Sequence, residues 1–189
     1  MQVCGIDEAG RGPALGSLFI GGISIEEKKI SKLKDIGVGD SKVLTARKRE
    51  ELFDKIIHIV DSYEIVELTP KKIDEALASQ SSNLNHLEMV YMAKIIKKLN
   101  PGKSIVDCCD PNTQRFANQL EDNSGVKNII AEHKAERHEV VAAASILAKV
   151  SRDKFMQEAS KKLKVDLGSG YGSDPKTQKF LNKNWQNEK

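Results

Sequence analysis

Cysteine, aromatic residues and long apolar runs are scarce in this chain of 189 residues. The three cysteines are an odd number, and Cys108 and Cys109 are neighbours that cannot easily bridge each other, so no disulfide framework is expected. A reducing, cytoplasmic environment is the natural location for such a chain. No window approaches about 18 uncharged apolar residues, and no basic segment followed by an apolar one opens the sequence. We therefore expect neither a membrane span nor secretion.

The composition excludes a disordered chain, because 39% of the residues are hydrophobic and can build a core. No repeat or Gly/Ser-rich linker divides the sequence. We expect one domain over 1–165, followed by a loop and a short helical tail over 166–189. The net charge is only +3, but residues 127–189 hold 13 basic and 8 acidic side chains. Contact with a polyanion would therefore involve mainly the C-terminal third.

Short β-prone segments alternate with helical periodicity, which predicts an α/β fold. Helices are expected after Thr45 as far as about Val60, and over 70–78, 83–99, 112–120 and 139–163. Strands are expected over 2–7, 16–25, 63–68, 103–107 and 126–131. This order predicts a mixed sheet with an antiparallel start and later parallel strands reached through helical crossovers.

Acidic residues distant in sequence share a predicted place at the ends of strands, where α/β sheets build their sites. Asp7 and Glu8 end the first strand, Asp107 ends the fourth, and Glu136 follows the fifth. Adjacent strand residues face opposite ways, so Asp7 and Glu8 would share an ion only if the strand breaks at Ala9-Gly10. Clustered carboxylates favour Mg²⁺ or Mn²⁺. The alternatives are solvated surface acids, or Asp110 in the place of Asp107.

The segment Gly10-Arg11-Gly12 adds a possible contact for phosphate. Glycines let the backbone approach a ligand, and the guanidinium would lie beside the acidic cluster, as a phosphodiester held over metal ions requires. The same pattern also fits a simple turn, and it is not a Walker loop. His133 is more typical of a structural residue than of a general base. Cys108-Cys109 lacks the second Cys/His pair that zinc needs.

The sequence resembles the type 2 ribonucleases H (the ribonuclease HII family) over residues 2 to about 180. The N-terminal run Gly5-Ile6-Asp7-Glu8-Ala9-Gly10-Arg11-Gly12-Pro13 carries the resemblance most strongly. Further matches follow in order: Asp40-Ser41-Lys42, Val106-Asp107-Cys108-Cys109-Asp110, Glu132-His133-Lys134-Ala135, Ala143-Ala144-Ser145-Ile146-Leu147-Ala148-Lys149-Val150 with Arg152-Asp153, and Gly168-Ser169-Gly170-Tyr171.

The resemblance implies a ribonuclease H-like fold with a five-stranded mixed sheet flanked by helices. It implies an endoribonuclease that cleaves the RNA strand of RNA/DNA hybrids and incises 5′ to single ribonucleotides in duplex DNA, with roles in RNA primer removal and ribonucleotide excision repair. Two ions about 4 Å apart, Mg²⁺ or Mn²⁺, would support attack by water and leave 5′-phosphate and 3′-hydroxyl ends. A monomer is expected, and a sliding clamp is a further partner open to the family.

The resemblance also implies roles for individual residues. The catalytic and metal-binding carboxylates would be Asp7, Glu8, Asp107 and Glu136, although the family usually has Asp at the last position. The 2′-hydroxyl would be read by backbone groups of the Gly-Arg-Gly segment and by a tyrosine that packs on the neighbouring sugar. The expected substrate contacts are Gly10, Arg11, Gly12, Lys42, Arg47, Lys149 and Tyr171. Of these, Lys42, Arg47 and Lys149 would contact phosphate.

Several alternatives stay open. Another nuclease of the same fold, such as a Holliday-junction resolvase or endonuclease V, would lack the Gly-Arg-Gly and Gly-Tyr pair. Ribonuclease HIII, which carries an added N-terminal domain, is a second alternative. A hybrid-binding protein whose catalysis has lapsed through Glu136 is a third possibility. Tyr171 itself could be only an anchor of its glycine-rich loop.

Overall fold

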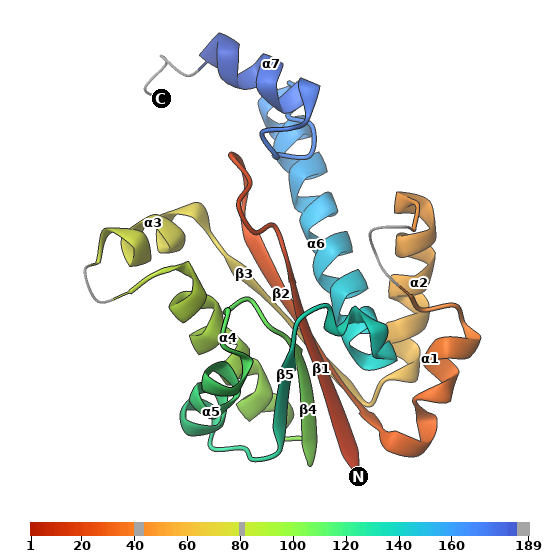
Figure 1. Ribbon diagram of the computed structural model, residues 1–189. Coiled ribbons are helices and arrows are strands. Elements are labelled where there is room, and N and C mark those ends of the chain that lie inside the picture. The colour runs from red at the N-terminus through yellow and green to blue at the C-terminus, as the bar shows by residue number, and fades with distance from the viewer. Residues whose placement is uncertain (40–43, 80–81, 185–189) are drawn as a thin grey trace.

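A five-stranded mixed sheet lies at the centre of the computed structural model, which describes residues 1–39, 44–79 and 82–184 (Figure 1). The order of the strands across the sheet is β3-β2-β1-β4-β5. β1 pairs antiparallel with β2 and parallel with β4, while β2–β3 is antiparallel and β4–β5 is parallel. The strands are β1 (Gln2–Ala9), β2 (Leu18–Glu26), β3 (Ser62–Leu68), β4 (Lys103–Asp107) and β5 (Ile129–Glu132). The predicted mixed α/β sheet is confirmed.

Helices cover both faces of the sheet and enclose a hydrophobic core on each side (Figure 1). One face carries α1 (Ser31–Asp35), α2 (Ala46–Ile59) and α6 (Glu139–Leu163), and the other carries α3 (Pro70–Ala78), α4 (Leu84–Leu99) and α5 (Thr113–Ser124). Two 3₁₀ turns, η1 (Glu27–Lys29) and η2 (Ala135–Arg137), and the C-terminal α7 (Pro175–Asn184) complete the described elements. No helix within these described ranges is long and apolar enough to span a membrane.

The predicted helices form where side-chain caps start them. Thr45, Asn83 and Asn112 each accept a hydrogen bond from the backbone N–H three residues later, so the last two are caps rather than first helical residues. The bounds of α3 and α6 agree with those predicted. The short α1 was not predicted, because five residues carry too little periodicity to be recognised. The proposed division at residue 165 falls between α6 and α7 and stays a prediction.

Two strands start later than predicted. The fifth strand starts at Ile129 rather than at residue 126, because the Glu121 carboxylate accepts hydrogen bonds from the backbone N–H groups of Asn128 and Ile129, at 2.9 and 3.3 Å. Asn128 also has a left-handed backbone, with a φ of 65°. The second strand starts at Leu18 rather than at residue 16, because Gly16 turns with a φ of +90°. Both boundaries were set by backbone geometry that hydrophobic patterning does not register.

Close contact between α6 and β1 holds the sheet against its longest helix. A Cβ atom built on Gly5 would overlap the backbone of Val140, at the start of α6. Ala142, Ala143 and Ala144 are fully or almost fully buried, so the Ala-rich stretch packs against the sheet as its small side chains predict. The first turns of α6 therefore lie at van der Waals distance from the strand that carries the acidic residues.

Gly5→Ala is expected to destabilise the protein by about 1–3 kcal/mol, the range found for overpacked cores, because the backbone of α6 cannot yield as a flexible side chain could. Gly172→Ala is the matched control, since a Cβ there meets nothing within 4 Å. Denaturant unfolding monitored by circular dichroism measures both. Equal midpoints for the two variants would contradict the close contact.

Candidate active site

The acidic residues of β1 lie inside the strand, which ends at the predicted break, Ala9-Gly10, rather than at Asp7. β1 continues through Asp7 and Glu8 to Ala9, paired throughout with β2. On its other side, pairing with β4 stops at Ile6 and Val106, so that edge of β1 is free beyond this point. The two side chains can therefore approach a common region around an unpaired strand edge. The end of β4, rather than a bend in β1, makes this possible.

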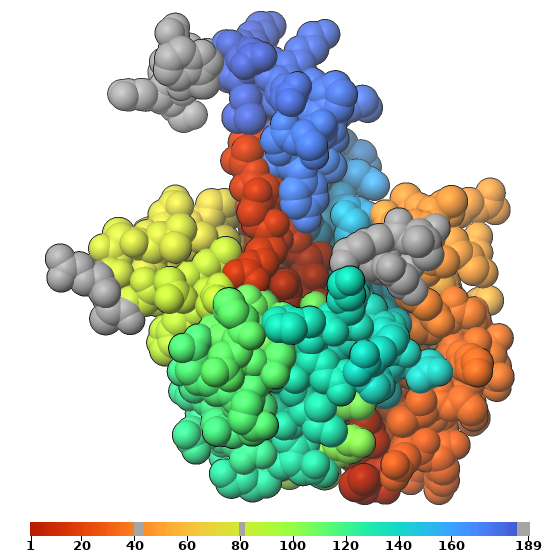
Figure 2. Space-filling model, in the orientation of Figure 1, coloured from red at the N-terminus to blue at the C-terminus, as the bar shows by residue number. Residues whose placement is uncertain are grey.

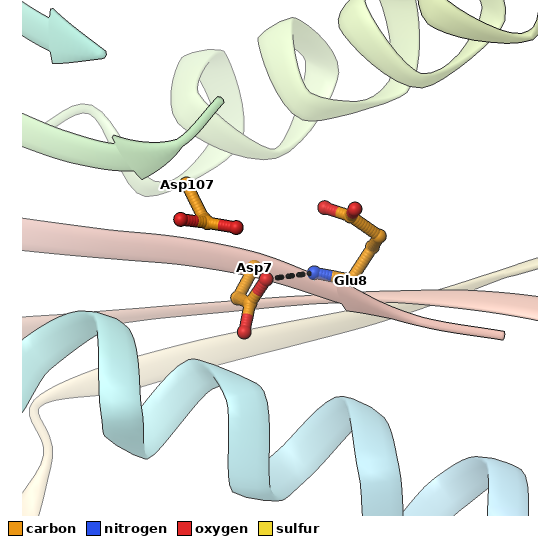
Figure 3. Close-up of side chains that lie close together, drawn as sticks. All are labelled: Asp7, Glu8 and Asp107. Atoms are coloured by element: carbon orange, nitrogen blue, oxygen red, sulfur yellow. Dashed lines mark hydrogen bonds between the residues drawn. The ribbon is translucent and has the colours of Figure 1, made fainter. Parts of the chain in front are cut away.

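Asp7, Glu8 and Asp107 form an acidic trio. One carboxylate oxygen from each lies within 4.8 Å of those from the other two. Asp7 and Glu8 point to different sides of β1, and Asp107 enters from the end of β4 (Figure 3). The backbone N–H of Glu8 donates to Oδ1 of Asp7 at 2.7 Å, and that of Ala135 donates to Oδ1 of Asp107 at 2.7 Å. Backbone donors thus fix two of the three carboxylates.

Burial and mutual repulsion make this trio costly to ionise. The pKa of Asp7 is raised to about 7, chiefly by burial and further by the charges of Asp107 and Glu136, although hydrogen bonds from Ser145 and from the backbone of Glu8 act to lower it. Burial likewise raises the pKa of Glu8 well above its usual range, followed by repulsion from Asp7. A cation that binds here would offset both effects.

The donor set fits a hard divalent cation. All three groups of the trio offer oxygen, which Mg²⁺ and Mn²⁺ prefer. Oε2 of Glu8 is buried and accepts no hydrogen bond from the described residues, so it retains a free lone pair for an ion. The group is made of carboxylates alone, with no nitrogen or sulfur ligand among its three members.

Glu136 lies in the same pocket but outside the trio. It sits in η2, after Lys134, whose left-handed backbone (φ 57°) turns the chain back from β5. Its charge reaches Asp7, whose pKa it raises. Glu136 is therefore near enough to act electrostatically on the trio, and its assignment as a metal ligand stays a prediction.

A pocket of about 410 Å³ opens over these carboxylates. Figure 2 shows this recessed region, where β1 (red) lies between the blue C-terminal segment and the green and teal segments. The lining combines residues from β1, β4, η2, α6 and the loop before α7: Asp7, Glu8, Ala9, Gly10, Arg11, Asp107, Glu136, Ser145, Lys149 and Tyr171. The structure thus brings together all four predicted carboxylates, two residues of the Gly-Arg-Gly turn, Lys149 and Tyr171.

Two residues near the carboxylates belong to segments of the family match, with no role predicted for either. Ser145 on α6 lines the pocket and hydrogen-bonds Asp7. Arg152 is fully buried, donates to the carbonyl of Ser169 at 2.8 Å and lies 4.5 Å from the centre of the Tyr171 ring. Gly10, with a φ of +95°, leaves no room for a Cβ beside Arg152. Arg152 therefore joins the Tyr171 loop to the Gly-Arg-Gly turn.

The remaining predicted substrate contacts are placed less favourably. Gly12 does not line the pocket. Arg47 is exposed on α2 and pairs with Glu51. Lys42 falls outside the described residues. The ring nitrogen Nδ1 of His133 contacts the Cys108 carbonyl at 3.1 Å, as a structural residue would.

Known structures establish the fold class. Bst ribonuclease HIII in complex with Mn²⁺ superposes with a TM-score of 0.81 at 21% identity, over 96% of this chain and 62% of that one. At this identity the likeness shows the fold alone, which is ribonuclease H-like. The oxygen-only acidic trio in the central pocket of this fold is a set of ligands that suits a divalent metal ion.

Residues 4–189 match the family model of ribonuclease HII, and the chain belongs to that family. It is 47% identical to ribonuclease HII of Thermococcus sibiricus, over 96% of this chain and 80% of the relative. The crystal structure of ribonuclease H2 from Pyrococcus horikoshii OT3 superposes with a TM-score of 0.88 at 44% identity, covering 97% and 86% of the two chains. The structure of a PCNA:RNase HII complex from Archaeoglobus fulgidus superposes with a TM-score of 0.89 at 37% identity, covering 97% of this chain and 88% of that one.

Membership confirms the resemblance seen in the sequence and sets aside the other nucleases of this fold. The chain is a hydrolytic endoribonuclease of RNA/DNA hybrids that depends on divalent metal, as its family is. The family match does not by itself assign the residues of the site.

Asp7→Asn is expected to stabilise the metal-free protein, by an amount that grows with pH. The folded protein holds a proton on Asp7 up to about pH 7, whereas the unfolded chain releases it near the ordinary pKa of 3.8. Ionisation of Asp7 therefore lowers stability as pH rises between these values. The increase in the free energy of unfolding caused by Asp7→Asn should be larger at pH 8 than at pH 5, by on the order of 2 kcal/mol.

Thermal unfolding in EDTA at the two pH values measures this difference. Added Mg²⁺ should raise the Tm of the wild type at pH 8 more than that of Asp7→Asn, because a ligand that binds only the folded state stabilises it. An Asp7→Asn gain that is independent of pH would show that Asp7 ionises normally.

Proposed function

We propose that Asp7, Glu8, Asp107 and Glu136 hold Mg²⁺ or Mn²⁺, and that this site also incises 5′ to a single ribonucleotide in duplex DNA. Cleavage there leaves 5′-phosphate and 3′-hydroxyl ends. One observation carries the proposal: the acidic trio, Gly10 and Arg11 of the turn, and Tyr171 line a single pocket. This common lining supports a site in which cleavage and recognition of a sugar act on one phosphate.

The carboxylates are held by rigid parts of the fold. Asp7 and Asp107 extend from adjacent parallel strands, and backbone N–H donors orient both. Bound divalent ions lower the pKa of a bound water and stabilise negative charge on the phosphate. Ser145 on α6 hydrogen-bonds Asp7, so the Asp7 carboxylate is already oriented before a metal ion or substrate binds.

Recognition of the ribose is assigned to Gly10 and Tyr171. Gly10 lines the pocket, and its backbone groups would meet a sugar edge, where a 2′-hydroxyl can both donate and accept a hydrogen bond. The Tyr171 ring lies over the Arg152 guanidinium, which fixes its plane before substrate arrives. This support favours a sugar-packing role over a simple loop anchor.

The outer contacts of the substrate and the cellular role complete the proposal. Lys149 lies in the pocket and would shift from Asp153 to a phosphate, with Arg11, Gly12, Arg47 and Lys42 as further contacts. Primer removal, ribonucleotide repair, a monomeric state, a cytoplasmic location and a sliding-clamp partner stay predictions. The PCNA complex of the Archaeoglobus fulgidus relative supports the last of these.

A nicking assay on duplex DNA with one embedded ribonucleotide tests this function. Wild type should cut 5′ to the ribonucleotide in Mg²⁺ or Mn²⁺, Asp7→Asn should be inactive, and Tyr171→Ala should lose about 5- to 150-fold, as expected for a stacking contact of about 1–3 kcal/mol. Tyr171→Ala should lose less on a long hybrid, which offers many registers. Tyr63→Ala, on β3 and 43% exposed, is the control.

Cleavage of the long hybrid with no cut at the lone ribonucleotide would refute the proposed incision. Equal small losses by Tyr171→Ala on both substrates would make Tyr171 a loop anchor. Binding of both duplexes without cleavage in either metal would support the hybrid-binding alternative.

Glu136 is expected to be an outer ligand whose extra methylene favours Mn²⁺. Mg²⁺ demands near-ideal octahedral geometry, and a misplacement of about 1 Å can cost roughly 10²-fold in a positioned reaction. Glu136→Gln should therefore cut activity strongly, and Glu136→Asp should keep or improve the Mg²⁺ rate relative to Mn²⁺. Turnover of the single-ribonucleotide duplex in each metal measures both. Unchanged turnover of Glu136→Gln in both metals would mean that Glu136 is only a surface acid.

A further inference from the structure

The Arg11 side chain joins two segments that are almost a hundred residues apart in sequence. Arg11 belongs to the turn after β1, yet its Nη1 donates to the carbonyl of Cys109, in the loop after β4, at 3.2 Å. Nη2 donates to Oδ1 of Asn85, at the start of α4. The guanidinium therefore spans the ends of the two strands that carry the acidic trio. Its hydrogen bonds are directed at the protein, although its side chain lines the pocket.

Glu88, one helical turn beyond Asn85 on α4, lies behind this guanidinium. Its side chain is fully buried, and Oε2 is 3.6 Å from Nη1 of Arg11, whose side chain is 35% exposed. Neither oxygen of Glu88 accepts an ordinary hydrogen bond from the described residues, although the Cys109 thiol lies against it. Burial of a carboxylate with so few partners is costly. An apolar side chain would pack there without that cost.

We propose that Glu88 is a positioning residue, which acts through Arg11. Together with Asn85 it holds the guanidinium against the Cys109 carbonyl and so fixes the Gly-Arg-Gly turn relative to the loop that follows Asp107. The spacing of Asp7 and Glu8 from Asp107 then depends on a contact outside the site. This inference rests on the proposed function of the acidic trio and adds to it a residue on α4.

Glu88→Gln keeps the size of the side chain and removes its charge. We expect kcat on an RNA/DNA hybrid to fall about tenfold, the scale of one coupled contact, with KM changed less than about twofold. The Tm should be unchanged or higher, because Arg11 is partly exposed and water can solvate it. In an Arg11→Ala background, Glu88→Gln should have no further effect on kcat.

Hydrogen exchange supplies a measurement that needs no turnover. Backbone amides around residues 10–12 and around residues 108–110 should both exchange faster in Glu88→Gln, since one guanidinium holds both segments. Glu64→Gln is the matched control, because Glu64 pairs with Lys98 in the last turn of α4, whereas Glu88 lies near the start of this helix. It should change neither exchange nor kcat.

Three outcomes would overturn the proposal: unchanged kcat in Glu88→Gln, a loss of kcat matched by a fall in Tm, or additive losses in the Arg11→Ala background. Faster exchange in only one of the two segments would overturn it as well. If wild type and Glu64→Gln fail to cleave hybrid at all, the proposed function fails, while the exchange experiment still decides whether Glu88 holds Arg11.

Discussion

The repulsion among carboxylates gathered at one end of the sheet is the constraint on which the other features depend. Asp7 is buried and Glu8 is partly buried, and this burial raises the pKa of both carboxyls. The charges of Asp107 and Glu136 raise the pKa of Asp7 further, and the charge of Asp7 raises that of Glu8. A fold that keeps them together must hold them by other means, because free carboxylates would separate or protonate. Parallel pairing of β1 with β4 and backbone donors to Asp7 and Asp107 supply this restraint.

Basic groups around the trio are engaged with the protein as well as directed at a substrate. Arg11 donates a hydrogen bond to the loop after β4, and the Arg152 guanidinium packs against the face of the Tyr171 ring. Each guanidinium joins segments that come together only in the folded chain. A duplex substrate would therefore meet a pocket whose positive charges are already fixed in place, which reduces the reorganisation that binding and catalysis require.

The packing of α6 is what brings helix residues into the site. Because Gly5 has no side chain, the start of α6 lies directly against β1, and Ser145 reaches Asp7 from the next turn. Lys149, one turn further on, faces the same pocket. A bulkier strand residue would move this helix away from the sheet and with it both side chains. Stability of the core and geometry of the site thus rest on the same contact.

The sequence alone determined the mixed sheet, most helix bounds and the family, because periodicity, caps and a long contiguous motif are local signals. It also predicted that Asp7, Glu8 and Asp107 lie together, as they do in the structure, since strand ends meet in α/β sheets. Only the tertiary structure showed that β1 continues through its acidic pair, because the decisive event is where β4 stops pairing. The places of Ser145, Arg152 and Glu88 were likewise decided by packing between distant segments, which no local pattern records.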